Sequence, residues 1–526
     1  MAYTTEEIVE PFWAESSSAA SGRDPLAIQN SSVVIYTRMI VGITNVTNRI
    51  RYNGFYCWIF DTILKNIKKK NSLQEQIISS RRAELLLAYI MVYNFPSVTG
   101  ISGSRYASKK LSPTINLRKG ADWEFKQKGE KVYWQASQGI FGQYYSGVTS
   151  KLSLINHPNP YVNLNIYTLT EKGLELTKAF KENIPSDVRT LFWKSVFNGS
   201  IQEEDLASLK SFALHLIPNQ SSEHNFYEHM LLSADDKKAE PTFNRRNTIK
   251  LLLTHLSAEN GGVENPVSSF LRANYLAHLN ESQLSKDTAT AWYLFEINEL
   301  LHVAYEHFHS SFLYSIETYP TILDSRIKEI VNDANQPFHA KGAEVNAKTI
   351  KDLSNLLSKN NEEVYLYYDA MEETFRSGEF GKCIMNAIKT IICVYLNSKR
   401  QLEQLEEFAA STENNFNRTG YAIELFNELV DSQWKLTIAE YIKAILVKAI
   451  NLHTFSSYSK TRIGQSLVHN YMIEDHSVWR LRETLPNRTT PRLQNVLQYI
   501  SDIGWIKREG KKFSITYSGI KIINGK

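Results

Sequence analysis

The chain has 526 residues, of which 43% are hydrophobic and 22% are charged, and its formal net charge is +4. A chain of this length exceeds what one hydrophobic core supports, so we expect two to four domains. The composition is that of an ordinary globular protein and excludes a disordered chain.

Two short segments hold most of the positive charge. Residues 480–526 carry ten Lys and Arg against three Asp and Glu, a net charge of +7, and residues 105–131 carry eight against three, a net charge of +5. Because the total is only +4, the rest of the chain has a net charge of −8. Such a concentration of cations on an acidic protein indicates local contact with a polyanion.

Cysteine usage and hydropathy indicate the compartment. The cysteines are Cys57, Cys383 and Cys393, an odd and sparse set without metal-ligand spacing, which favours a reducing cytoplasm. Met1–Trp13 lacks the apolar core of a secretory signal. The best apolar stretches are too short, or carry a lysine, to cross a bilayer. We therefore expect a cytoplasmic protein without a membrane segment.

Residues 1–100 predict an N-terminal helical region. Thr47 or Asn48 can cap a helix whose aromatic and aliphatic residues share one face, namely Tyr52, Phe55, Tyr56 and Ile59. Arg82–Phe95 is nearly all apolar after Glu84 and predicts a buried helix.

Residues 101–184 predict a smaller mixed module. The helical period disappears between Gly100 and Trp134, and Gly, Ser, Lys and short alternating runs replace it. Ile166–Phe180 then predicts a short strand, a turn at Gly173 and a helix.

Residues 185–455 carry helical periodicity almost throughout and predict one large helical domain. The clearest helix is Ala289–Tyr314, in which apolar residues repeat at spacings of three and four. The opposite side carries two Glu-x-x-His pairs, formed by Glu299, His302, Glu306 and His309. Di-metal carboxylate bundles draw such pairs from two different helices, so we expect a solvated or interface polar face and no metal. Were a metal bound, Glu299 and His302 would be the first choice.

Residues 456–526 predict a C-terminal module of helix, strand, hairpin and strand. Thr490-Pro491 is a cap and first-turn proline for a helix over 492–503, which Gly504 ends. Residues 505–508 and 513–516 predict two strands joined by a basic hairpin at 509–512. In this order of elements the segment resembles the second half of a winged helix.

The winged-helix resemblance implies double-stranded DNA as a partner. The helix would offer hydrogen-bonding side chains to base edges, and the hairpin would offer cations to phosphates. The candidate DNA-binding residues are Arg488, Arg492, Gln494, Asn495, Gln498, Lys507, Arg508, Lys511 and Lys512.

An internal repeat suggests a second copy within 101–184. Tyr167–Leu176 and Phe513–Ile522 share the pattern aromatic-x-aliphatic-Thr-x-x-Gly-aliphatic-x-aliphatic. We expect a strand whose Thr caps the next helical turn, with Gly relaxing the backbone. The predicted fold class is thus mainly α, a multidomain helical protein with one or two winged-helix modules.

Catalytic motifs give no clear reaction, and we expect no catalytic residues, metal or cofactor. Arg272 and His278 have the spacing of the helical HEPN ribonucleases, although Ala273 stands where that family usually has a polar residue. Glu124 and Lys126 form only half of a metal-dependent nuclease core, without an upstream Asp on a strand. A phosphate loop is also missing, since residues 378–382 lack its Ser or Thr.

The N-terminal segment carries a second resemblance. Asp24-Pro25-Leu26, Thr47–Tyr52 and Phe55–Trp58 look like the opening of uncharacterised bacterial proteins encoded among mobile-element and antiphage-defence genes. Together these patterns favour a non-enzymatic DNA-binding or scaffold subunit of a bacterial multi-protein system, in antiphage defence or genome maintenance, with other protein subunits as partners. A nuclease and a purely protein-binding adaptor remain the alternatives.

Overall fold

A computed structural model describes residues 24–66, 72–159, 161, 165–233, 244–259, 261–336, 347–358, 363–412, 421–460, 469–489 and 491–525. The fold is mainly helical, with four small antiparallel sheets in the described part of the chain, so the predicted mainly-α, multidomain class is confirmed. No described helix is long and apolar enough to cross a membrane.

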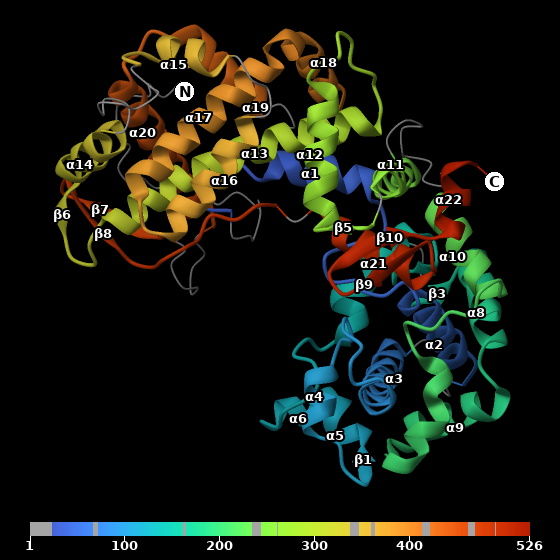
Figure 1. Cartoon of the computed structure of the whole chain (residues 1–526). Coiled ribbons are helices and arrows are strands. Elements are labelled where there is room, and N and C mark those ends of the chain that lie inside the picture. The colour runs from blue at the N-terminus through green and yellow to red at the C-terminus, as the bar shows by residue number, and fades with distance from the viewer. Residues whose placement is uncertain are drawn as a thin grey trace. The chain divides into compact units, whose positions relative to one another are not determined.

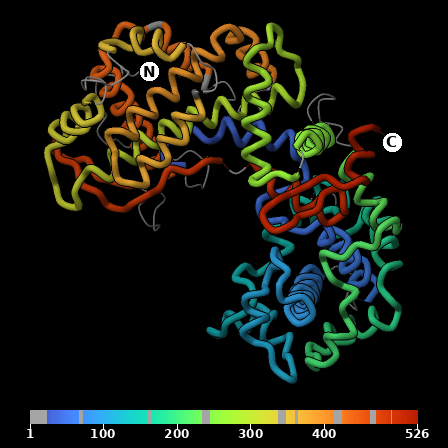
Figure 2. The backbone as a smooth tube through the Cα atoms, in the orientation of Figure 1, coloured from blue at the N-terminus to red at the C-terminus, as the bar shows by residue number. Residues whose placement is uncertain are grey.

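The chain forms two compact units, each discontinuous in sequence (Figures 1 and 2). Unit 1 contains residues 1–37 and 270–491, and unit 2 contains residues 38–269 and 492–526. Helices α1 (Asn30–Met39) and α12 (Pro266–His278) each run across a boundary between the units. These units differ from the four consecutive segments expected from the sequence: residue 456 lies inside a helix of unit 1, and the segment 185–455 is divided between both units.

Unit 1 is built around one long buried helix, α13 (Thr288–Ser315). Its N-cap is Asp287, whose side chain accepts the Thr290 N–H at 3.0 Å. Helices α14 (Leu323–Asn335), α16 (Glu363–Arg376), α17 (Phe380–Ser398), α19 (Tyr421–Glu428) and α20 (Ile438–Lys460) pack against it (Figure 1). A helix covered on so many sides must bury its polar residues as well as its apolar stripe.

The other elements of unit 1 lie around this helical core. They are α15 (Ile350–Leu357), a 3₁₀ segment (Lys399–Gln401), α18 (Leu402–Thr412), a π-helix (Leu429–Gln433) and the three strands β6 (Thr321–Ile322), β7 (Tyr471–Glu474) and β8 (Ser477–Arg480). The strands form a sheet of order β6-β8-β7, in which Val478 lies opposite both Thr321 and Ile473.

Unit 2 has an aromatic core around α2 (Tyr52–Asn66). The Trp58 ring lies 5.0 to 5.8 Å, centroid to centroid, from Phe180, Phe192 and Phe212. Two arginines just before α2 are paired inside this core. Arg51 donates to both carboxylate oxygens of Glu223 at 2.9 and 3.0 Å, and Arg49 pairs with Asp502 at 2.5 Å.

The other helices of unit 2 follow in chain order. They are α3 (Leu73–Asn94), α4 (Ser104–Lys109), α5 (Leu117–Ala121), α6 (Trp123–Gln127), a π-turn (Phe141–Tyr145), α7 (Ser146–Lys151), α8 (Glu171–Glu182), α9 (Ser186–Asn198), a 3₁₀ segment (Glu203–Phe212), α10 (Ser222–Leu232), α11 (Arg245–Ala258), α21 (Leu493–Asp502) and α22 (Tyr517–Ile523). The strands are β1 (Thr114–Asn116), β2 (Ile155–Asn156), β3 (Thr168–Leu169), β4 (Ser200–Gln202), β5 (Val263–Glu264), β9 (Ile506–Glu509) and β10 (Lys512–Ile515). Strand β1 pairs with β4 and β2 pairs with β3.

The C-terminal helix, strand, hairpin and strand form as expected, but they complete a sheet with a distant segment. The sheet order is β5-β10-β9, with Phe513 opposite Val263 on one side and Arg508 on the other. Helix α11 packs on α22 and β10, and Figures 1 and 2 show the red C-terminal segment beside it. We call α11, β5, α21, β9, β10 and α22 the C-terminal module.

The start of α21 differs from the expected cap. The helix begins at Leu493 after Arg492, which has a φ of 59° and makes no capping hydrogen bond with its side chain. Pro491 therefore precedes the cap instead of opening the helix, and Thr490 lies outside the described residues.

The internal repeat is also a repeat of structure. We call α2, α3, α7, β2, β3 and α8 the first module. Thr170 caps α8 by accepting the Gly173 N–H at 3.0 Å, and Thr516 caps α22 by accepting the Gly519 N–H at 3.3 Å. The backbone N–H of each threonine donates to the carbonyl at the end of the preceding helix-to-strand turn, Leu154 or Trp505. The predicted capping role of the threonines is confirmed.

The two glycines of the repeat serve close packing, not backbone relaxation. Neither Gly173 nor Gly519 has a positive φ. A Cβ on Gly173 would overlap the Leu154 carbonyl oxygen, and one on Gly519 would overlap the Trp505 carbonyl oxygen. The expectation that glycine relaxes the backbone here was wrong; the glycine lets the last helix press onto the turn.

The modules differ at the third strand. In the C-terminal module, Val263 of β5 pairs with Phe513. At the equivalent Tyr167 of the first module, the side chain of Gln76 takes that place: its Nε2 donates to the Tyr167 carbonyl and its Oε1 accepts the Tyr167 N–H, both at 2.9 Å. One buried amide thus satisfies the backbone groups that a strand satisfies in the other module.

Substitution of Gly519 by alanine tests this close packing. The added Cβ meets a backbone oxygen that cannot rotate away, so we expect Gly519→Ala to destabilise unit 2 by about 1–3 kcal/mol in thermal or denaturant unfolding. The matched control is Gly147→Ala in α7, where no atom lies within 4 Å of the added Cβ. That variant should be as stable as wild type or slightly more stable; equal stability of both variants would contradict the packing role.

Candidate functional site

The β9–β10 hairpin presents four exposed cations, Lys507, Arg508, Lys511 and Lys512. Lys507 lies 2.7 Å from Glu509, and both side chains are largely exposed. The guanidinium of Arg508 lies 5.4 Å from the Phe513 ring centre, and its Nε donates to the Gly510 carbonyl. The hairpin therefore keeps its positive charge at the surface, where a polyanion can reach it.

The expected base-reading helix, α21, is largely covered. Asn495 is buried, and its Nδ2 donates to the Asn48 side chain at 3.0 Å and to the Thr47 carbonyl at 3.3 Å. Arg492 donates to the Ile43 carbonyl at 3.2 Å. The segment before α2 thus occupies the face that a DNA major groove would need, and the predicted base contact by Asn495 is wrong for this conformation.

The remaining polar residues of α21 divide between surface and interior contacts. Gln498 is half-buried and donates to Asp502 at 2.9 Å, the carboxylate that also binds Arg49. Gln494 is exposed. Of the four polar residues proposed to read bases, only Gln494 points fully to solvent.

Arg488 does not fit its predicted role in DNA binding. It belongs to unit 1, and its guanidinium pairs with the buried carboxylate of Glu296, with a second carboxylate, Glu299, 4.0 Å away. An arginine that neutralises buried carboxylates is not available to phosphates. It is therefore a structural cation, and proximity in sequence to the basic hairpin is misleading.

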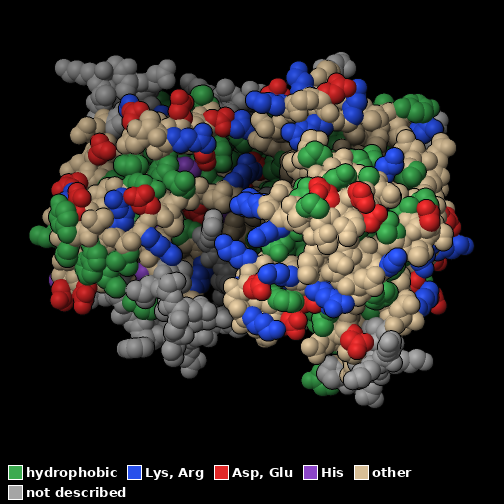
Figure 3. Space-filling view, turned by 90° about the horizontal axis from the view of Figure 1, so that it is seen from below, with side chains coloured by type: hydrophobic (Ala, Val, Ile, Leu, Met, Phe, Trp, Pro, Cys, Tyr) green, Lys and Arg blue, Asp and Glu red, His purple; other side chains and the backbone are tan. Residues whose placement is uncertain are grey.

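The second basic block, residues 105–131, is at the surface of unit 2. Its exposed cations are Arg105, Lys109, Lys110, Arg118, Lys119, Lys128 and Lys131, and Lys126 is half-buried. Lys119 lies 3.1 Å from Glu130. Figure 3 shows Lys and Arg side chains, in blue, among the side chains on one face of the structure.

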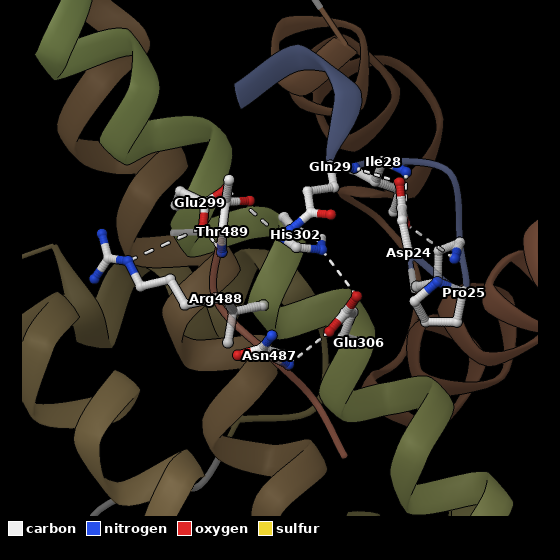
Figure 4. Close-up of polar contacts among 12 residues, drawn as sticks. Asp24, Pro25, Ile28, Gln29, Glu299, His302, Glu306, Asn487, Arg488 and Thr489 are labelled. Carbon is white, nitrogen blue, oxygen red and sulfur yellow. Dashed lines mark hydrogen bonds and ion pairs between the residues drawn. The ribbon is translucent and has the colours of Figure 1, made fainter. Parts of the chain in front are cut away.

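A buried cluster of carboxylates and histidine occupies the polar face of α13 (Figure 4). His302 lies between two glutamates: its Nε2 is 2.9 Å from Glu306 Oε1, and its Nδ1 is 3.5 Å from Glu299 Oε1. The backbone N–H of Thr489 donates to Glu299, and that of Asn487 donates to Glu306, both at 2.7 Å. Of the two alternatives expected for this face, solvated or interface, the solvated one was wrong, because residues 487–489 cover it.

Neighbouring charges outweigh the effect of burial on the pKa values of Glu299 and His302. Burial alone would raise the pKa of Glu299, but His302 and Arg488 lower it to about 2. Burial alone would lower the pKa of His302, but Glu306 and Glu299 raise it well above its ordinary value. Burial raises the pKa of Glu296, which Arg488 partly offsets.

Asp24 joins this cluster from the N-terminal segment. Its carboxylate accepts the backbone N–H groups of Leu26, Ile28 and Gln29 at 3.0–3.3 Å. Ligand atoms of Asp24, His302 and Glu306 all lie within 4.8 Å of one another. Of these three, the sequence singled out His302 and Glu306; Asp24, far away in the chain, could be found only in the fold.

His309, the last of the four polar residues, stands apart from this cluster. Its ring packs 4.6 Å from His453 and 5.7 Å from Tyr471, centroid to centroid. Both ring nitrogens are buried without a hydrogen-bond partner among the described residues. Burial lowers the pKa of His309 to about 3, so this histidine is a neutral packing residue.

The candidate nuclease residues do not assemble a catalytic site. Arg272 pairs with Asp369 and lies over the Tyr365 ring, whereas Nδ1 of His278 donates to the Asn274 carbonyl and the ring stacks on Tyr293. Glu124 and Lys126 lie on the short helix α6 and not on a strand, so the strand geometry of a metal-dependent nuclease core is not formed. Comparison with protein families, with curated proteins and with solved structures found no match for this chain.

Replacement of Arg488 tests its structural role. In Arg488→Met, Glu296 and Glu299 lose their buried counter-ion, and we expect a loss of about 3–5 kcal/mol in unfolding free energy. Arg508→Met removes the same charge at an exposed position and should change stability by no more than about 0.5 kcal/mol. Denaturant unfolding measures the stability of both variants. A small effect of Arg488→Met would contradict the structural role and leave Arg488 a candidate for phosphate contact.

The buried His309 predicts a pH dependence of stability. The folded protein keeps it neutral down to about pH 3, whereas the unfolded chain takes up the proton below about pH 6.5. Stability should therefore fall as the pH falls from about 6.5 towards 3, with a contribution of up to about 1.4 kcal/mol per pH unit.

Chemical unfolding at pH 6.5 and pH 5 measures this slope. We expect it to be shallower in His309→Leu than in wild type, and the same replacement at the exposed His229 is the control. A slope unaffected by His309→Leu would show that this histidine is protonated, or solvated, in the folded state.

Proposed function

We propose that this protein is a non-enzymatic DNA-binding subunit whose C-terminal module is a winged helix. The supporting observation is the exposed β9–β10 hairpin with its four cations. Because cations released from the DNA backbone drive such association, each Lys or Arg that meets a phosphate adds affinity that falls with salt.

The topology of the C-terminal module supports the winged-helix assignment. In a winged helix, a first strand pairs with the last strand of a hairpin that follows the third helix. Here the elements run α11, β5, the start of α12, then α21, β9 and β10, in the sheet order β5-β10-β9. We infer that unit 1 residues 270–491 are an insertion between the second and third helices of this module.

The proposed contact is with the DNA backbone and not with base sequence. The helix α21 is covered by the segment around Thr47 and Asn48, which binds Asn495. Phosphate contacts position a protein without reading sequence. The second basic block, on the same unit, would extend this contact along a duplex.

A protein-binding adaptor is the second candidate. The cover over α21 favours it, since a module whose base-reading face is closed can act as a docking block. The bacterial defence or genome-maintenance setting, and further protein subunits as partners, rest on the resemblance of the N-terminal segment and are part of the proposal.

Reversal of charge on the hairpin tests the proposed function. We expect Lys511→Glu/Lys512→Glu to weaken duplex DNA binding, and to reduce the slope of log affinity against log salt by about 2, since two phosphate contacts are lost. Titration of a labelled duplex at several salt concentrations measures both quantities.

The matched control is Lys328→Glu/Lys351→Glu, which makes the same charge change at exposed sites of unit 1. This control should keep the wild-type salt slope. Equal loss in both variants would mean that only net charge matters, and unchanged DNA binding in both would contradict contact through the hairpin. No DNA binding by the wild-type protein would favour the adaptor.

A further inference from the structure

We propose that Asp24, His302 and Glu306 hold one divalent transition-metal ion, such as Zn²⁺ or Mn²⁺, in unit 1. This inference does not depend on DNA binding. The three side chains offer one imidazole nitrogen and two carboxylates, a mixed set that suits first-row divalent ions.

The spacing of the ligand atoms fits one ion. His302 Nε2 and Glu306 Oε1 are 2.9 Å apart. Two neighbouring ligands at about 2.1 Å from a metal are about 3.0 Å apart at an octahedral angle and about 3.4 Å apart at a tetrahedral angle, so this pair needs a shift of at most about 0.5 Å. All three ligand atoms lie within 4.8 Å of one another, and a modest inward shift of Asp24 would close the set.

The surroundings of His302 provide a second, independent indication. A metal-bound histidine usually donates its other ring N–H to a carboxylate, which orients the ring. Here Nδ1 of His302 faces Glu299 Oε1 at 3.5 Å, and both atoms are buried without a hydrogen-bond partner among the described residues. The other oxygen of Glu299 is fixed by the Thr489 N–H.

The ligand oxygens are held but not saturated. The outer oxygen of Glu306 accepts the Asn487 N–H. Asp24 uses Oδ1 for Leu26 and Ile28 and Oδ2 for Gln29. A carboxylate has about four acceptor positions, so Asp24 keeps one for an ion, and the turn that it forms would place that oxygen.

Charge balance also favours a divalent ion. Four carboxylates, those of Asp24, Glu296, Glu299 and Glu306, face the cations Arg488 and Lys460. Lys460 Nζ donates to the backbone carbonyl of Asp24. With a neutral His302, a divalent ion would make this set neutral, whereas uncompensated buried charge is costly. The competing occupant is a proton on His302 Nε2, shared with Glu306.

Metal retention by the full-length protein distinguishes the ion from the proton. Tag-free protein is stripped with EDTA, exposed to Zn²⁺ or Mn²⁺, desalted and analysed by mass spectrometry for bound metal. We expect about one ion per chain and a rise in the thermal unfolding midpoint. Absence of retained metal, with no thermal shift, would establish the proton-only ion pair and overturn the proposal.

Three variants and one control test whether these residues hold the ion. Asp24→Asn keeps an oxygen for the turn but removes the charge. Asp24→Asn and His302→Gln, each as a single variant, should abolish retention of the metal ion. Glu299→Gln should weaken affinity by about 10–100-fold, as expected of a carboxylate that orients a ligand. The control is Asp324→Asn, which removes a carboxylate at an exposed position of unit 1 outside this set and should retain the ion. If His302→Gln does not fold, Asp24→Asn decides alone: wild-type metal content in that variant contradicts the site.

Discussion

The pairing of β5 with β10 is the contact on which the C-terminal module depends. It joins residues 263–264 to residues 512–513, with the whole of residues 270–491 between them in the chain. Closing so long a loop costs entropy that grows only slowly with its length, and the inserted unit is itself folded around α13. The module therefore needs residues from both sides of the inserted unit. A fragment that begins at residue 456 would contain α21, β9 and β10 but would lack β5 and α11, which complete them.

Burial separates the cations near the C-terminus into two kinds. Lys511 and Lys512 stand on an exposed hairpin, whereas Arg488 neutralises carboxylates inside unit 1. Arg49 and Arg51, in the segment just before α2, are likewise buried in ion pairs, with Asp502 and Glu223. Because removal of one partner would leave the other charge buried and unpaired, loss of either arginine would destabilise unit 2. A count of charges along the chain cannot make this distinction, because it does not say which side chains are buried and which are exposed to solvent.

The two modules share one arrangement of elements but pair the backbone groups at the edge of their sheets in different ways. Thr170 and Thr516 make the same cap, and Gly173 and Gly519 allow the same close approach. The edge beside Tyr167 is satisfied by the Gln76 amide, and the edge beside Phe513 is satisfied by a strand. Backbone groups at a buried edge need partners of the right geometry, and the kind of partner is free to vary. Only the C-terminal module carries a basic hairpin among the described residues, which concentrates the proposed DNA contact there.

Local pattern was enough for the elements: the period of Ala289–Tyr314, the Thr-x-x-Gly cap and the β9–β10 hairpin all follow from neighbours in the chain, and each is present in the fold. Tertiary structure alone decided what those elements face. Whether Glu299 and His302 meet solvent or residues 487–489, whether Asn495 meets a base or Asn48, and whether Asp24 reaches His302 are contacts between segments far apart in sequence. The spacing of apolar residues predicts which face of a helix is buried, but α13 is buried on all of its faces. Burial of its polar face depends on segments far away in the sequence, so the local pattern cannot predict it.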